Sequence, residues 1–177
     1  MDSNRQLIEQ MLILRCQMGD NEAFAELIDR YGRALYYFIS KLLKNTEIAE
    51  DIYQETWLAV IKKIHSLKDT DSFTAWLYHI ARNKVYHHLR RKKLIQELNE
   101  NIVAENYEDG NDFSVEDAAN IHKALEKLHP AHREVLMLRF LEQMSYEQIT
   151  QVINCSMGTV KSRIYYAKNA LKKELEK

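Results

Sequence analysis

Apolar residues recur every three or four positions along most of this chain, the spacing that places them on one face of an α-helix. The clearest run follows Asn21, and its apolar positions are Phe24, Leu27, Ile28, Tyr31, Leu35, Phe38, Ile39 and Leu42. Strand-like alternation is nearly absent, and only four Gly and one Pro interrupt the helical pattern. The pattern therefore predicts an all-α protein.

Three further helices are predicted in the first half of the chain. They run over residues 2–18, from Thr46 onward, and from Phe73 to about residue 93. Thr46 is the expected N-cap of one, and Asp71 or Ser72 of another, because their side chains accept hydrogen bonds from the first free backbone N–H groups. The apolar face of the first helix is predicted to consist of Leu7, Met11, Leu14 and Met18.

The periodic pattern stops after residue 98 and returns near Val115. The segment between is polar and acidic, which is typical of a flexible linker. Pro130 suits the first turn of a following helix, where its missing N–H costs nothing. The sequence therefore predicts two small helical domains, residues 1–96 and 114–177, joined by a flexible acidic linker over residues 97–113.

The second domain contains the pattern of a helix-turn-helix. Ser145 and Gln148 form a predicted capping box, and the short helix ends at Asn154, a residue that tolerates left-handed backbone. Ser156 caps the next helix after a short turn, which is helix-turn-helix spacing. In such units the second helix reads base edges near its N-terminus. The candidate DNA-binding residues there are Ser156, Met157, Thr159, Lys161, Ser162 and Arg163.

Charge is distributed unevenly along the chain, although the formal net charge is only −1. Residues 62–95 hold nine Lys/Arg against two Asp/Glu, and residues 127–177 hold nine against five. Residues 96–120 hold eight Asp/Glu and no Lys/Arg. The positive charge is therefore concentrated in two blocks separated by an acidic segment, and the C-terminal block also fits a solvated basic helix end. The acidic segment is expected to weaken binding of free protein to DNA by repulsion.

The first basic block interleaves aromatic and cationic residues at intervals of four. Tyr78, Arg82, Tyr86 and Arg90 form one row, and a neighbouring row consists of His79, Asn83, His87 and Arg91. Aromatic rings alternating with cations suit single-stranded nucleic acid, because rings stack on bases and cations pair with phosphates. The same pattern also fits a solvated helix face whose aromatic rings cover the core, and the spacing leaves both readings open.

No enzyme, metal site or cofactor site is expected from the sequence. The three histidines near residue 80 do not converge on one helix face, and residues 73–93 contain no Asp or Glu. A phosphate-binding loop and a nucleophile–base motif are both missing, so no small-molecule substrate is expected. Cys16 and Cys155 are expected to be free. The N-terminus lacks the features of a signal peptide, so the protein is expected to be cytoplasmic.

Stretches in both halves resemble bacterial sigma factors of the extracytoplasmic-function group. "GDNEAFAELIDRYG", "AEDIYQETW", "FTAWLYHIARN" and "HHLRR" are similar to the second conserved region of that family. "ALEKLHPAHREVLMLRF", "SYEQIT" and "GTVKSRIYYAKNALKK" are similar to its fourth region. The resemblance implies a sigma factor that binds core RNA polymerase, directs it to promoters, melts the −10 element and reads the −35 element. An anti-sigma factor is a further expected partner.

The resemblance also implies roles for individual residues. Asp51, Gln54 and Glu55 match the positions that dock on the largest polymerase subunit. The stretch "HSLKDTDS" matches the loop that captures a flipped −10 base, and Asn83 matches a base-contacting Asn. The expected −10 contacts are Leu67, Asp69, Ser72, Tyr78, Arg82, Asn83, Tyr86 and Arg90.

The chain departs from the family pattern at a few positions. His87 stands where many members have Asp, and Asn154 stands where Gly is common. The role of His87 is left open by this difference. The alternative function is a free-standing helix-turn-helix regulator that binds duplex DNA without polymerase, which predicts tight DNA binding by the protein alone.

Overall fold

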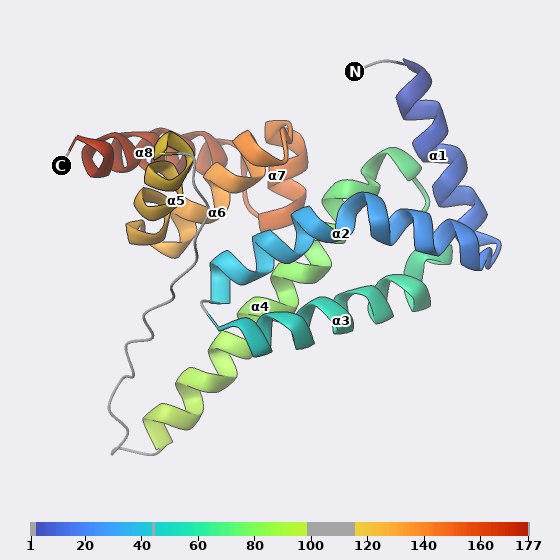
Figure 1. The fold of residues 1–177 in the computed structure, drawn as a ribbon, viewed down its shortest axis with the longest axis horizontal. Helices are drawn as coiled ribbons and strands as arrows, with labels where there is room; N and C mark the ends of the chain where they lie inside the picture. The colour runs from blue at the N-terminus through green and yellow to red at the C-terminus, as the bar shows by residue number, and fades with distance from the viewer. Residues whose placement is uncertain (1–2, 44, 99–115, 177) are drawn as a thin grey trace. The chain divides into compact units, whose positions relative to one another are not determined.

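The computed structural model describes residues 3–43, 45–98 and 116–176, and every regular element among them is helical (Figure 1). This confirms the predicted all-α class. The elements are α1 (Ser3–Gln17), α2 (Asn21–Leu43), α3 (Thr46–Lys63), η1 (Ile64–Ser66), η2 (Thr70–Ser72), α4 (Phe73–Leu98), α5 (Glu116–Lys127), α6 (Pro130–Leu136), η3 (Met137–Leu141), α7 (Tyr146–Ile153) and α8 (Met157–Leu175). They form two compact units, Met1–His87 (unit 1) and His88–Lys177 (unit 2). Residues 99–113 of the predicted linker, and Val115, lie outside the described residues.

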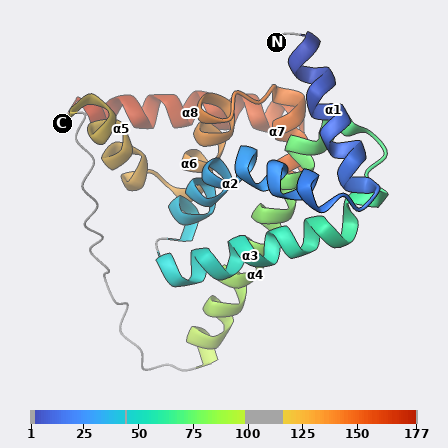
Figure 2. The same ribbon diagram turned by 45° about the vertical axis from the view of Figure 1, so that its right-hand side comes forward.

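The core of unit 1 lies between α2, α3 and the first half of α4. α2 and α3 lie side by side in both ribbon views (Figures 1 and 2). Of the eight apolar positions predicted along α2, five are fully buried and the other three half-buried, so this prediction is confirmed. The facing buried side chains are Ala49, Ile52, Trp57 and Val60 of α3 and Phe73, Leu77, Ala81 and Val85 of α4.

The inward face of α1 differs from the predicted one. Leu7, Met11, Leu14 and Met18 are between 50% and 87% exposed. The buried residues are Leu12, Ile13 and Cys16. α1 has apolar residues on more than one face, so spacing alone found a stripe without showing that it meets the core. The Cys16 thiol is free, as expected, and burial raises its pKa to about 11.

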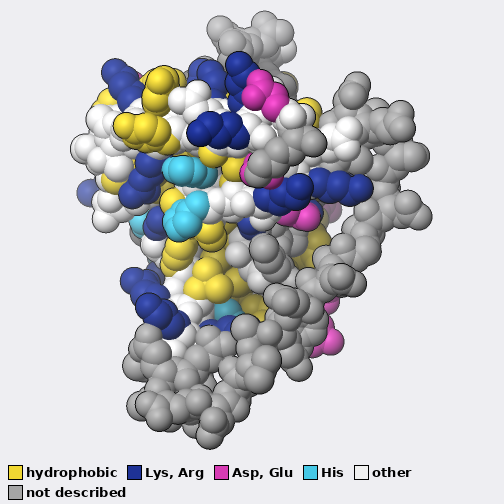
Figure 3. Space-filling view, turned by 90° about the vertical axis from the view of Figure 1, so that its left-hand side faces the viewer, with side chains coloured by type: hydrophobic (Ala, Val, Ile, Leu, Met, Phe, Trp, Pro, Cys, Tyr) yellow, Lys and Arg dark blue, Asp and Glu magenta, His cyan; other side chains and the backbone are white. Residues whose placement is uncertain are grey.

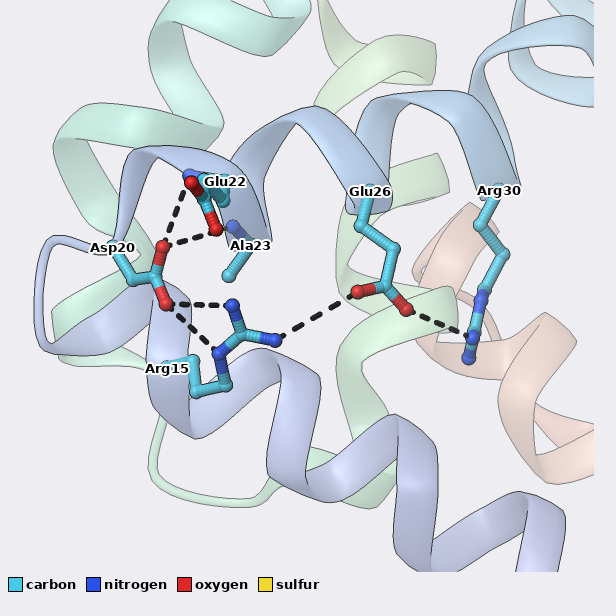
Figure 4. A network of polar contacts seen from close by, with 6 residues as sticks. All are labelled: Arg15, Asp20, Glu22, Ala23, Glu26 and Arg30. Atoms are coloured by element: carbon cyan, nitrogen blue, oxygen red, sulfur yellow. Dashed lines mark hydrogen bonds and ion pairs between the residues drawn. The ribbon is translucent and has the colours of Figure 1, made fainter.

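A carboxylate at the junction of α1 and α2 starts α2. Asp20 Oδ1 accepts hydrogen bonds from the backbone N–H groups of Glu22 (2.9 Å) and Ala23 (3.1 Å), as Figure 4 shows. Arg15 Nε donates to Asp20 Oδ2 at 2.8 Å, and its guanidinium also pairs with Glu26 at 3.8 Å. The backbone N–H of Ala23 and the Arg15 guanidinium stabilise the ionised carboxylate and lower the pKa of Asp20.

The cap of α3 differs from the predicted one by a single residue. Asn45, not Thr46, is the N-cap, and its side chain accepts from the Ile48 backbone N–H at 3.0 Å. Asn and Thr are both good caps, so the choice depends on where the chain leaves extended backbone, which the sequence pattern locates only to within a residue or two.

Unit 2 contains a buried arginine that the sequence pattern did not single out. Arg133 of α6 is only 2% exposed. Its Nε donates to the Leu125 carbonyl at 2.9 Å, and its Nη2 donates to the carbonyls of Glu126 (2.6 Å) and Leu128 (3.1 Å). The last carbonyls of a helix have no partner within the helix. Arg133 therefore caps the C-terminal end of α5 and is not available to bind DNA.

The length and hydropathy of the described helices show whether any of them could cross a membrane. None of the helices within residues 3–43, 45–98 and 116–176 combines the length and apolar character needed to cross a bilayer.

Candidate nucleic-acid interface

The loop between α3 and α4 consists of two 3₁₀ turns, η1 and η2, with extended residues between them. Asp69 Oδ1 accepts from the Asp71 backbone N–H at 3.0 Å, and the Ser72 hydroxyl donates to the Asp69 carbonyl at 2.7 Å. These short-range bonds give the turn its shape. Leu67 is half-buried and Asp69 exposed, so the loop presents its tip to solvent while two of its predicted base-contacting residues also hold its backbone.

Tyr78 is a core residue and not the exposed −10 contact that the sequence predicted. Its side chain is fully buried, and its ring meets Phe38 edge-to-face with centroids 5.1 Å apart. Four residues turn an α-helix by about 400°, so a row spaced by four drifts by about 40° at each step. Arg82 and Tyr86 are accordingly half-buried and Arg90 is exposed. The predicted row reaches the surface only from Arg82 onward.

The exposed part of α4 keeps the interleaved character that suggested single-strand binding. The Arg82 guanidinium lies over the Tyr86 ring, 4.4 Å from its centroid. Such stacking holds both planar groups in one orientation. Asn83 is exposed, and its amide nitrogen is hydrogen-bonded to His79 Nε2 at 2.8 Å. Asn83 is therefore supported by a histidine that lies one turn earlier on α4.

Short-range contacts shape the helix-turn-helix of unit 2. Ser145 and Gln148 form the predicted capping box, with bonds of 3.1 Å and 2.9 Å in the two directions. Asn154 adopts left-handed backbone at φ 50° and ψ 57°. Ser156 accepts from the Thr159 backbone N–H at 3.2 Å and so caps α8. All three sequence predictions are confirmed.

The start of α8 presents hydroxyl and cationic side chains. Lys161 and Ser162 are exposed, and Met157, Thr159 and Arg163 are half-buried. The opposite face of α8 is held in the core by Val160, Ile164 and Ala167. The buried stripe thus fixes which face of α8 points to solvent.

On the molecular surface, the space-filling view shows Lys, Arg and His side chains lying among apolar ones (Figure 3).

Two exposed tyrosines extend this surface along α8. Tyr165 and Tyr166 are 63% and 60% exposed, and their rings meet edge-to-face at 5.4 Å. The sequence prediction did not include them among the binding residues. Their adjacency in the sequence, outside the buried stripe, was the signal that marks them as surface aromatics.

The acidic face of α3 is exposed at the positions predicted to bind polymerase. Asp51, Gln54 and Glu55 are all exposed, while Ile52 on the same helix is buried. Glu55 Oε2 also pairs with Lys84 Nζ of α4 at 3.0 Å, an ion pair that the sequence did not predict. Exposed ion pairs of this kind contribute little to stability. The Glu55 side chain is 61% exposed and so remains accessible to a partner.

In the part of the chain that the structure describes, no three His, Cys, Asp or Glu side chains lie close enough to hold a metal ion. The exposed side chains of α4 and α8 offer a ligand hydrogen-bonding groups, cations and aromatic rings. Groups of these kinds contact nucleic acid.

Family comparisons match both units. The Sigma-70 region 2 family matches residues 27–95, and the Sigma-70, region 4 family matches residues 118–171. The ECF RNA polymerase sigma factor SigW of Bacillus subtilis is 32% identical, over 92% of this chain and 94% of that protein. The RNA polymerase sigma-H factor of Pseudomonas aeruginosa is 30% identical, over 95% of this chain and 94% of that protein.

A solved structure agrees with these relatives. The sigma factor RpoE of Bartonella quintana, in complex with the anti-sigma factor NepR, superposes with a TM-score of 0.74 at 27% identity. The alignment covers 86% of this chain and 96% of that one. Both matched regions occur in order along a chain of similar length. The first covers most of unit 1 and continues along α4 to residue 95, and the second lies within unit 2. The chain belongs to the extracytoplasmic-function (ECF) family of RNA polymerase sigma factors.

Proposed function

We propose that this sigma factor binds core RNA polymerase through α3, captures the −10 single strand with the loop 64–72 and α4, and reads the −35 duplex with the start of α8. The match of both sigma regions to two helical units, each with an exposed polar surface, carries the proposal. The −10 element is thereby assigned to the loop 64–72 and α4, and the −35 element to the start of α8.

At the −10 element, the proposed contacts are Leu67, Asp69, Ser72, Arg82, Asn83, Tyr86 and Arg90. An unstacked base offers a flat face for an aromatic or guanidinium group and polar edges for amide and carboxylate groups. The stacked Arg82–Tyr86 pair suits the first role, and the exposed Asn83 amide suits the second. We assign the exposed Arg90 to a phosphate contact.

At the −35 element, the proposed contacts are Ser156, Met157, Thr159, Lys161, Ser162 and Arg163. A helix that enters the major groove uses the side chains of its first turns to reach base edges. A guanidinium binds guanine in a bidentate manner, whereas an ammonium mostly pairs with phosphate. We therefore assign base recognition to Arg163 and phosphate contact to Lys161.

Polymerase docking is assigned to the exposed Asp51, Gln54 and Glu55 of α3. Reversing the charge of Asp51 and Glu55 to Lys should weaken binding of core polymerase in a pull-down while circular dichroism stays unchanged. The matched control reverses two exposed carboxylates of α2, Glu22 and Asp29, which changes the net charge equally without altering α3. Equal affinity of the two double variants for core polymerase would refute the assignment.

The regulatory partner and the boundaries are part of the same proposal. RpoE of Bartonella quintana was solved with an anti-sigma factor, and we extend an anti-sigma partner to this chain. We place this sigma factor in the cytoplasm together with core polymerase. The proposed domain boundaries are 1–96 and 114–177, with residues 97–113 as the linker.

Run-off transcription tests the whole proposal. Core polymerase with this protein should transcribe genomic promoter fragments that core polymerase alone ignores. In gel shifts at about 150 mM salt the protein alone should bind promoter duplex weakly, because a few cations release few counterions. Nanomolar binding by the protein alone, with no effect on transcription, would replace the proposal with a free-standing regulator.

A further inference from the structure

Three glutamines of α1 point to the loop between α3 and α4. Gln6, Gln10 and Gln17 follow one another at intervals of four and seven, which places them along one face of a helix. Their amides all donate to groups within residues 64–71. α1 precedes residue 27, where the match to sigma region 2 begins, so that match assigns α1 no role.

Gln17 holds the backbone of the loop. Its Nε2 donates to the Ile64 carbonyl at 2.9 Å and to the Leu67 carbonyl at 2.8 Å, so both amide hydrogens are used. Leu67 has extended backbone at φ −71° and ψ 113°. Outside a helix or sheet, backbone carbonyls need other partners. The half-buried Gln17 side chain supplies that partner to the Leu67 carbonyl. It adds a second bond to the Ile64 carbonyl, which already accepts from the Leu67 N–H at 3.0 Å.

Gln10 and Gln6 hold the other end of the loop. Their Nε2 atoms donate to Asp71 Oδ1 at 2.7 Å and 3.1 Å. The Asp71 backbone N–H in turn donates to Asp69 Oδ1 at 3.0 Å. The two glutamine bonds stabilise the ionised carboxylate and lower the pKa of Asp71. Hydrogen bonds therefore connect α1 to Asp71, and Asp71 in turn to Asp69 at the exposed tip of the loop.

We propose that α1 is a positioning element for promoter recognition, in which Gln17 and Gln10 hold the loop 64–72 in the conformation that selects the captured −10 base. The inference rests on the proposed −10 function of that loop. A binding site works only when its groups are held within a fraction of an ångström. The 3₁₀ turns are short, so they depend on tertiary contacts for their rigidity. α1 provides those contacts without touching the base.

Substitutions at Gln17 separate positioning from packing. Gln17→Glu keeps the size of the side chain but replaces both donors with an acceptor, which would face two carbonyl oxygens. Gln17→Lys changes the shape but keeps donors that can reach those oxygens. Met11→Glu is the matched control, since it adds the same charge to α1 at an exposed position away from the loop.

The readout is base selectivity of the assembled holoenzyme. Run-off transcription is measured on four promoters that differ only in the base at the captured −10 position, and the ratio of best to second-best promoter is compared. Gln17→Glu should lower this ratio by about tenfold, the size expected when part-buried hydrogen bonds are lost. Gln17→Lys should stay within about threefold of the natural protein, and Met11→Glu should leave the ratio unchanged.

A second measurement covers the case in which Gln17→Glu fails to fold. Gln10→Leu removes the exposed bond to Asp71 and should lower the same ratio by a smaller factor. Amide hydrogen exchange of residues 67–72 should speed up in both variants, while exchange in α8 stays unchanged.

The outcomes distinguish this inference from the proposed function. If the natural protein supports no promoter-dependent transcription, the proposed function fails. If the natural protein selects a base and Asp69→Ala abolishes that selection, the function stands. An unchanged ratio in Gln17→Glu, or in Gln10→Leu where Gln17→Glu does not fold, then overturns the role of α1. An equal loss of transcription on all four promoters would also overturn the role of α1, because it would show that Gln17 supports packing but does not affect base selectivity.

Discussion

The loop 64–72 of unit 1 and the helix-turn-helix of unit 2 reach their shapes in different ways. In the helix-turn-helix the shaping bonds join residues three positions apart, as between Ser145 and Gln148. In the loop the bonds from Gln17 to Ile64 and Leu67 join residues 47 and 50 positions apart. The helix-turn-helix is therefore shaped by local bonds, whereas the loop combines local bonds at Asp69 with bonds from a helix elsewhere in the fold.

This difference has consequences for substitution. A locally specified turn keeps its shape as long as its own caps are present. A loop held by another helix loses its shape when that helix moves, even if every loop residue is unchanged. Distant substitutions should therefore affect −10 recognition more than −35 recognition.

The largest expected effect tests the core of unit 1. Tyr78→Ala removes a fully buried ring that packs on Phe38, and loss of a core aromatic costs about 3–5 kcal/mol. The matched control is Leu14→Ala in the same unit, since that side chain is 50% exposed. Urea unfolding followed by tryptophan fluorescence isolates unit 1, because both Trp57 and Trp76 lie there. Equal free energies of unfolding of the two variants would contradict the burial of Tyr78 in the core.

The second effect concerns recognition without loss of shape. Arg163→Ala should weaken −35 binding by about 1–3 kcal/mol and relax selectivity at one base pair, if the guanidinium binds a base. Lys161→Ala, the phosphate control, should weaken binding to all sequences alike. Holoenzyme binding to a set of −35 variants measures both. A uniform loss for Arg163→Ala would make it a phosphate contact instead.

A smaller effect tests whether the helix-turn-helix is specified locally. Ser145→Ala removes the capping box of α7 and should cost about 1 kcal/mol. Amide exchange of α7 should speed up, while the tryptophan signal of unit 1 unfolds at the same urea concentration as before. Ser145→Thr, which keeps the hydroxyl, is the control. A change in the tryptophan transition would contradict the separation of the two units.

The smallest effect is a pH dependence of the loop. The pKa of Asp71 is lowered in the folded protein by the bonds from Gln6 and Gln10. Its stabilising contribution is therefore present above the unfolded pKa of about 3.9 and is lost as the pH falls through the lower folded value. Amide exchange of residues 69–72 should speed up over that range. Asp71→Asn, which keeps an acceptor but does not titrate, should remove this dependence.

Several features of the candidate site were predictable because they are encoded over a few residues. The caps at Ser145 and Ser156 and the left-handed Asn154 follow from residue types at fixed short spacings. The exposure of Asp51 and Glu55 follows from helical periodicity, because the buried face of α3 is formed by other positions such as Thr56 and Val60. The predicted row along α4 was wrong at Tyr78, because a spacing of four drifts around the helix until one end enters the core.

The sequence by itself determined the helices, their order, the helix-turn-helix and the family motifs, since each depends on neighbours within one or two turns. The tertiary structure alone decided which face of α1 is buried, that Arg133 caps the end of α5, and that Gln17 holds the loop 64–72. These contacts join residues on different elements. Periodicity records which side of a helix is apolar but not which partner that helix meets, so only packing in three dimensions could show them.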